Sequence, residues 1–128
     1  MDRRNTRTPL AHAAGLGPCR TGVEDWWAQR VSAIALIPLT LWFAASIIAH
    51  IRSDHAAFVN WLKSPASAIL MILLLIALFH HTALGLKVVI EDYTRAGAKF
   101  ATLILMRLSC FAVAVVGIIA TLRIVFRG

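Results

Sequence analysis

The sequence predicts an all-α membrane protein with three transmembrane helices in a bundle. Of its 128 residues, 59% are hydrophobic and only 15% are charged, a balance typical of chains surrounded by lipid. Three apolar stretches, 31–51, 66–91 and 101–126, are each long enough to cross a bilayer as a helix. Because helices that face lipid build little internal core, we expect the chain to work in an obligate complex or oligomer.

The charge distribution also indicates a membrane rather than a nucleic-acid partner. Thirteen lysines and arginines against six acids give a formal net charge of +7. These cations stand at the ends of the apolar stretches, where they anchor helices among lipid headgroups, and they form no basic patch. We therefore expect no nucleic-acid binding. Cys19 and Cys110 lack CxxC spacing, so we expect neither a disulfide nor a cysteine metal site.

Residues 1–21 are interpreted as a cytoplasmic tail, and residues 22–128 as a three-helix anchor domain. The tail is rich in arginine and has no apolar run of the kind found in a secretory signal, so we expect it to be retained and to become ordered against a partner. Thr21-Gly22-Val23-Glu24 matches a capping box. This motif predicts that the first helix begins near Gly22.

The first span, 31–51, follows two tryptophans suited to the headgroup layer, Trp26 and Trp27. Pro38 lies inside the span and removes the hydrogen bond to the carbonyl four residues earlier, which predicts a bend. We expect Thr40 or a neighbouring helix to compensate.

Residues 50–63 are predicted to be a short polar connection, with Trp61 as a second interfacial anchor. Ser64-Pro65 combines a good helix cap with the proline favoured at the first helical position, so the second helix should begin there. We expect this helix to continue to about Arg95 and to end near Gly97.

The third span, 101–126, is almost entirely apolar but contains Arg107 near one end. Two interpretations of Arg107 remain open, a side chain that extends to the headgroups and a partner for an acidic group or a ligand carboxylate.

The positive-inside rule predicts a cytoplasmic N-terminus and a C-terminus on the opposite side. The tail and the second connection carry more cations than the other side of the membrane does. The cytoplasmic group is Arg3, Arg4, Arg7, Arg20, Arg30, Lys87, Arg95, Lys99 and Arg107, and the opposite group is Arg52, Lys63, Arg123 and Arg127.

The stretch 78–93 carries the candidate chemistry, because ionisable groups within a span are costly and usually functional. His81, Gly85 and Asp92 share one helix face at 100° per residue. Gly85, one turn after His81, could leave the flat space that a porphyrin needs. A haem ligand, a metal ligand, a proton relay and a packed hydrogen-bonding histidine all remain open for His81.

The other polar residues of this stretch form two groups. His80 points about 100° away from His81, in a stripe with Lys87 and Glu91, whose i and i+4 spacing predicts a charge pair. Asp92-Tyr93 places a carboxylate beside a phenol at the membrane surface. Such a pair suits proton transfer to a quinone and hydrogen bonding to its carbonyl, but it also suits a solvated helix end.

These residues together resemble a known family. The segment His81-x3-Gly85-x6-Asp92-Tyr93 is similar to the signature of the small hydrophobic membrane anchor subunit of succinate dehydrogenase, the respiratory complex II. The segment Trp26-Trp27-x-Gln29-Arg30-x-Ser32-Ala33, ahead of the first span, is also similar to the pattern of this family. The resemblance covers roughly Arg7 to the C-terminus.

The resemblance implies roles for four residues. His81 would be an axial ligand of a haem b, with the second ligand supplied by a histidine of the other membrane anchor in the complex, the partner anchor. Tyr93 would donate a hydrogen bond to a carbonyl oxygen of ubiquinone, and Asp92 would organise or protonate that site. Arg30 would lie near the haem propionates or the quinone pocket.

The resemblance also implies an assembly and a location. The chain would have no complete active site of its own and would anchor an iron-sulfur subunit and a flavoprotein subunit that pass electrons from succinate to quinone. The expected location is the bacterial inner membrane, with the mitochondrial inner membrane as the alternative. Two other functions stay open: a homodimeric membrane cytochrome b with His81 from each copy, and a small proton-coupled transporter that uses His80, Lys87 and Glu91.

Overall fold

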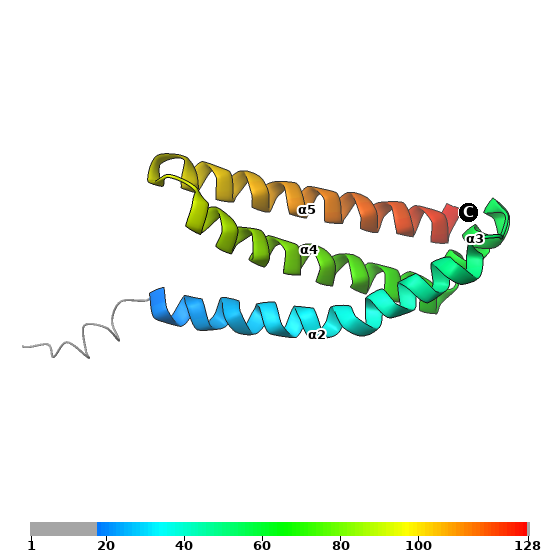
Figure 1. The fold of residues 1–128 in the computed structure, drawn as a ribbon. Coiled ribbons are helices and arrows are strands. Elements are labelled where there is room, and N and C mark those ends of the chain that lie inside the picture. The colour runs from blue at the N-terminus through cyan, green and yellow to red at the C-terminus, as the bar shows by residue number, and fades with distance from the viewer. Residues whose placement is uncertain (1–17, 128) are drawn as a thin grey trace, which may run out of the picture.

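The computed structural model describes residues 18–127, in which four helices follow one another: α2 (Pro18–His50), α3 (His55–Lys63), α4 (Pro65–Tyr93) and α5 (Ala96–Arg127) (Figure 1). Three of the four, α2, α4 and α5, are long and apolar enough to cross a membrane. The predicted all-α fold with three spans is therefore confirmed. Most of the predicted tail, residues 1–17, lies outside the described residues.

Helix α4 is the central element of the bundle. It packs against α2 on one side and α5 on the other, and Figure 1 shows it between them. Very few side chains are enclosed by this packing, and the buried apolar residues among those described are Leu62, Ala68, Leu74 and Leu84. The large apolar side chains on the outer surface must be covered by lipid or by other chains.

Helix α2 begins at Pro18, one turn before the predicted start near Gly22, so the predicted capping box does not start the helix. Proline suits the first turn of a helix because its missing amide proton has no helical acceptor there. Figure 1 shows that α2 bends in its second half, which contains Pro38. Thr40 does not compensate the carbonyl that Pro38 frees, because its hydroxyl donates to the carbonyls of Leu36 at 2.5 Å and Ile37 at 3.1 Å.

Residues 50–63 are not the simple polar connection that we expected, because most of them form helix α3. The Asp54 carboxylate caps this helix by accepting from the Ala57 amide at 2.9 Å. Trp61 stacks on Trp42 of α2, with ring centroids 5.8 Å apart, and packs against His50 at 5.1 Å. These aromatic contacts hold α3 against the end of α2, which the local sequence pattern could not reveal.

Helix α4 begins at Pro65 as predicted, after Ser64, whose hydroxyl accepts from the Ser67 amide at 3.3 Å. Its end differs from the prediction. Thr94 has an extended backbone and ends α4 after Tyr93, and α5 begins two residues later, at Ala96. The helix therefore does not reach Arg95, and Gly97 belongs to α5. This tight turn places Asp92 and Tyr93 in the last turn of α4, at the end of the bundle where α2 begins (Figure 1).

Candidate functional site

His81 is held by a hydrogen bond between α4 and α2. Its Nδ1 lies 3.0 Å from the hydroxyl of Ser32, a buried residue one span earlier in the chain. The Ser32 hydroxyl also donates to the backbone carbonyl of Gln29 at 3.0 Å. When its single proton is donated to Gln29, the Ser32 hydroxyl accepts the second hydrogen bond from Nδ1–H of His81. In that tautomer Nδ1 carries the proton and the Nε2 lone pair is free.

The free nitrogen of His81 remains accessible. Within residues 22–127, Nε2 has no hydrogen-bond partner. It is also not a fully buried atom, because the one fully buried side-chain nitrogen or oxygen without a partner in this range is Gln29 Oε1. Nε2 therefore keeps some open surface. An imidazole with one nitrogen anchored and the other free of a hydrogen bond is what an axial metal ligand requires, because the anchoring bond sets the tautomer and the ring orientation.

His80 has different surroundings from His81. It is exposed and lines a hollow between α4 and α5 that Arg107 and Phe111 also line. The two adjacent histidines therefore serve different sides of α4: His81 contacts α2, whereas His80 faces the α5 side. Of the two, it is His81 that is anchored by a neighbouring helix.

A cavity of about 500 Å³ lies between α2 and α4, toward the α4–α5 turn. A Cβ atom added at Gly85 would lie 3.6 Å from Gln29 Nε2, so the space beside Gly85 is bordered by an amide of α2. The Oε1 atom of the same amide is buried without a partner among the described residues. An orphaned acceptor beside a cavity suits a water or a donor from a bound group or another chain. The cavity is lined by Gly22, Asp25, Trp26, Gln29, Leu84, Gly85, Lys87, Val88 and Glu91.

Lys87 forms an ion pair with Asp25 of α2 and not with Glu91, the partner predicted from helix spacing. Both members are partly exposed, at 26% for Lys87 and 39% for Asp25. The backbone carbonyl of Glu91 instead accepts from Lys99 Nζ at 3.0 Å. The local i and i+4 rule failed because a carboxylate from another helix, 62 residues earlier, lies within reach.

Asp92 and Tyr93 are open to their surroundings. Both are exposed, Tyr93 to 87%, and neither makes a side-chain hydrogen bond with residues 22–127. Tyr93 follows His81 by twelve residues, or about 18 Å along the helix. The acid and the phenol therefore form a separate polar site at the end of α4, which a ligand or a neighbouring chain can approach freely.

Arg30 is not brought together with His81. Its guanidinium lies 4.8 Å from the centroid of the Trp26 ring, an arrangement typical of a cation–π contact. Arg30 and Ser32 are two residues apart and so point about 200° apart around α2. Since Ser32 faces His81, Arg30 lies on the opposite, exposed face of the helix.

Two contacts at this site, through Asp25 and Ser32, were missed by reasoning from the sequence. Asp25 gave no local signal, because its partner is far along the chain. Ser32 belongs to the segment that resembles the family pattern, but nothing in its spacing assigned it to His81. No group of three or more histidine, cysteine, aspartate or glutamate side chains able to hold a metal ion occurs among the described residues.

The fold and the site define a class of protein, a multi-pass helical membrane protein with an anchored histidine inside the bundle and an acid–phenol pair at one end. The family model for the succinate dehydrogenase/fumarate reductase transmembrane subunit matches residues 4–121. The chain belongs to this family.

Similar proteins include three curated relatives, each called a succinate dehydrogenase hydrophobic membrane anchor subunit. The relative from Rickettsia bellii is 32% identical over 99 residues, which cover 77% of this chain and 79% of that protein. The relative from Paracoccus denitrificans is 29% identical over 116 residues, covering 91% and 90%. The relative from Rickettsia conorii is 27% identical over 116 residues, covering 89% and 92%. No solved structure matches the chain.

The ion pair between α2 and α4 leads to a stability prediction. Replacing Asp25 with Asn should lower the midpoint of thermal unfolding by an amount equivalent to about 1 kcal/mol or less, because the pair is partly exposed. Adding Lys87→Met to Asp25→Asn should cost little more, since the interaction is already lost. The matched control is Glu91→Gln, which should leave the midpoint unchanged. Equal destabilisation by Glu91→Gln and Asp25→Asn would show that Lys87 pairs within α4.

Proposed function

We propose that this chain is the hydrophobic membrane anchor subunit of a succinate dehydrogenase and contributes one ligand to haem b and part of a ubiquinone site. The family match over residues 4–121 and the names of the relatives support the anchor role. The chain then has no complete active site of its own. It holds soluble partner subunits at the membrane and helps to carry electrons from succinate to quinone.

The hydrogen bond between Ser32 and His81 is the observation that carries the haem assignment. It leaves Nε2 as the free nitrogen on a ring that is already oriented. The described part of the chain offers one such imidazole, so we assign the second axial ligand to a histidine of the partner anchor. A haem bound there supplies one-electron redox chemistry within the membrane.

The quinone assignment rests on the chemistry and exposure of Asp92 and Tyr93. The Tyr93 phenol can donate a hydrogen bond to a quinone carbonyl oxygen, and the Asp92 carboxyl group can pass a proton to the same site. Both side chains are exposed at the end of α4. A quinone site must exclude water from its ring, so we infer that neighbouring subunits cover this pair and complete the pocket.

The proposed assembly contains a flavoprotein subunit, an iron-sulfur subunit, the partner anchor and this chain, surrounded by membrane lipid. We propose that the N-terminus and the Asp92-Tyr93 end lie on the cytoplasmic side of a bacterial inner membrane, where the iron-sulfur subunit would dock. The mitochondrial inner membrane is the alternative. The place of Arg30 near the haem propionates or the quinone pocket stays a prediction, because Arg30 lies on an exposed face of α2 directed away from His81.

The alternative functions differ in how well the geometry supports them. A transporter site built from His80, Lys87 and Glu91 needs these groups together. Lys87 and Glu91 line the cavity between α2 and α4, where Lys87 already pairs with Asp25, whereas His80 lines a different hollow beside α5. The geometry therefore weakens this alternative. A homodimeric cytochrome b would use the same anchored His81, and a subunit inventory of the purified native complex separates it from the four-subunit assembly.

The haem assignment predicts different effects at the two adjacent histidines. His81→Leu should abolish the haem b absorption of the purified complex or shift it strongly, because the iron loses a ligand. His80→Leu is the matched control and should retain the spectrum, since His80 faces the α5 side. Reduced-minus-oxidised spectra of both variants check this, with the presence of all four subunits verified on the same samples. An unchanged spectrum in His81→Leu would refute the assignment.

Ser32 should control how firmly His81 binds haem. Ser32→Ala removes the acceptor for Nδ1–H, so haem affinity should fall by about tenfold, the lower end of the usual effect of losing such a partner. The haem midpoint potential should rise, because an imidazole without this hydrogen bond donates less electron density to ferric iron. Ser32→Thr keeps a hydroxyl and should preserve both values. Haem content per complex and a redox titration measure these effects, and unchanged values in Ser32→Ala would show that the contact does not orient the ligand.

The quinone role of Tyr93 predicts a selective loss of activity. Tyr93→Phe should reduce succinate:ubiquinone activity about three- to tenfold, the range expected for one lost hydrogen bond. Succinate oxidation with an artificial acceptor that takes electrons before the quinone site should stay intact. The two assays are compared on the same preparation. A parallel loss of both activities would point to an assembly defect and against a quinone contact.

A further inference from the structure

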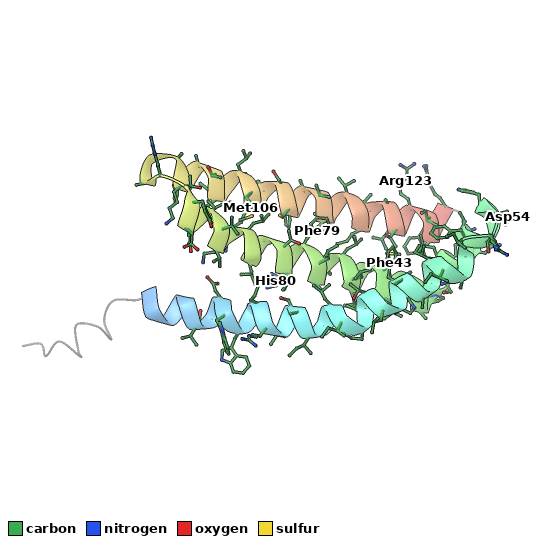
Figure 2. The ribbon with its side chains drawn as sticks, viewed as in Figure 1. Phe43, Asp54, Phe79, His80, Met106 and Arg123 are labelled. Atoms are coloured by element: carbon green, nitrogen blue, oxygen red, sulfur yellow. The ribbon has the colours of Figure 1, made fainter. Side chains whose placement is uncertain are left out.

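A groove follows the contact between α4 and α5, and Arg107 lies at its centre. Two adjoining hollows make up the groove and share this residue. The hollow nearer the α4–α5 turn has a volume of about 230 Å³ and is lined by Lys87, Phe100, Leu103, Ile104 and Arg107. The other, of about 290 Å³, continues toward the middle of the helices, and Figure 2 shows Phe79 pointing from α4 toward α5 in this region.

The groove carries positive charge without a matching acid. Arg107 is exposed and makes no ion pair or hydrogen bond with the described residues. Lys87, the other cation of the groove, already pairs with Asp25. Neither hollow is lined by an aspartate or a glutamate of the described chain. A cation in a span without a partner is costly, so this position favours an anionic ligand.

The side chain of Arg107 is long enough to reach the boundary between headgroups and hydrocarbon. Helix α5 has 32 residues and is about 48 Å long, whereas the hydrocarbon core is about 30 Å thick. A centred helix therefore extends about 9 Å beyond the core at each end. Arg107 is eleven residues, or about 16 Å, from Ala96, which places its Cα about 7 Å inside the core. A long side chain that extends toward the turn brings the guanidinium close to the lipid phosphates.

The second hollow lies at the depth of acyl chains. It begins at Arg107 and continues toward the bilayer centre along apolar side chains that include Phe79, Phe111 and Ile118. A cation at the boundary with an apolar groove beneath it matches the two parts of a phospholipid, a phosphate above an acyl chain.

We propose that the groove between α4 and α5 binds one phospholipid from the leaflet that contains the α4–α5 turn. Arg107 binds the phosphate, and an acyl chain lies along Phe79, Phe111 and Ile118. A headgroup with net negative charge is preferred over a zwitterionic one, because no acid of the described residues lines the groove to receive an ammonium group. This site is distinct from His81, which contacts α2, and from Tyr93, and it does not depend on the haem or quinone assignments.

The test uses the intact complex purified in mild detergent and exposed to phosphatidylglycerol or phosphatidylcholine with the same acyl chains. Native mass spectrometry counts the lipids retained per complex. The wild-type complex should retain one phosphatidylglycerol about tenfold more strongly than phosphatidylcholine, the order expected of one charge-assisted contact. Arg107→Gln should lose this preference, and Arg107→Lys should keep part of it. Arg123→Gln is the matched control, an exposed arginine near the other end of α5, and should behave as wild type.

A second variant tests the acyl-chain groove without changing the charge. Ala114→Phe fills the hollow beneath Arg107 and should reduce retention of both lipids, and it keeps the proposal testable if Arg107→Gln does not assemble. Inorganic phosphate at millimolar concentration should not displace the retained lipid. Equal retention of the two lipids by the wild type, full retention in Arg107→Gln or Ala114→Phe, or displacement by phosphate would each overturn the lipid site.

Discussion

The hydrocarbon core of the membrane is the constraint on which the rest of the structure depends. With no water to satisfy backbone amides and carbonyls, a crossing segment must have these groups paired within the protein, and a helix of sufficient length pairs them within itself. Helices α2, α4 and α5 meet this requirement, and their mutual packing encloses very few side chains. Apolar burial within the chain therefore contributes little to its stability. Close helix contacts, a few polar links and neighbouring molecules must supply the remainder.

The central position of α4 gives each polar group on this helix a different neighbour. His81 and Lys87 contact α2 through Ser32 and Asp25, whereas His80 faces the groove beside α5. Asp92 and Tyr93 remain exposed in the last turn. Helix α4 thus carries three kinds of polar group: the anchored His81, Lys87 of the ion pair with Asp25, and the exposed pair Asp92-Tyr93. Adjacent positions differ by about 100°, which is enough to separate these roles.

The long helices could be predicted from the sequence, because the length of an apolar stretch can be read directly from the sequence and every segment that crosses the hydrocarbon core must reach the same minimum length. The start of α4 at Pro65 was also predictable, since Ser64 and Pro65 act within one turn. Helix α3 was missed because its polar composition resembles a connection, and its aromatic contacts with α2 are distant along the chain. The end of α4 was misplaced by about two residues because Thr94, rather than a glycine, adopts the extended backbone that ends the helix.

For the candidate site, the sequence by itself indicated which residues are candidates for chemistry. His81, Asp92 and Tyr93 are ionisable or polar groups within or beside an apolar span, and their spacing along α4 follows from helix geometry alone. Only the tertiary structure decided their partners: Ser32 for His81, Asp25 in place of Glu91 for Lys87, and no partner within residues 22–127 for Asp92 and Tyr93. The physical reason is that helix periodicity sets the direction of a side chain, whereas the group it meets depends on how another helix, distant in sequence, packs against that face.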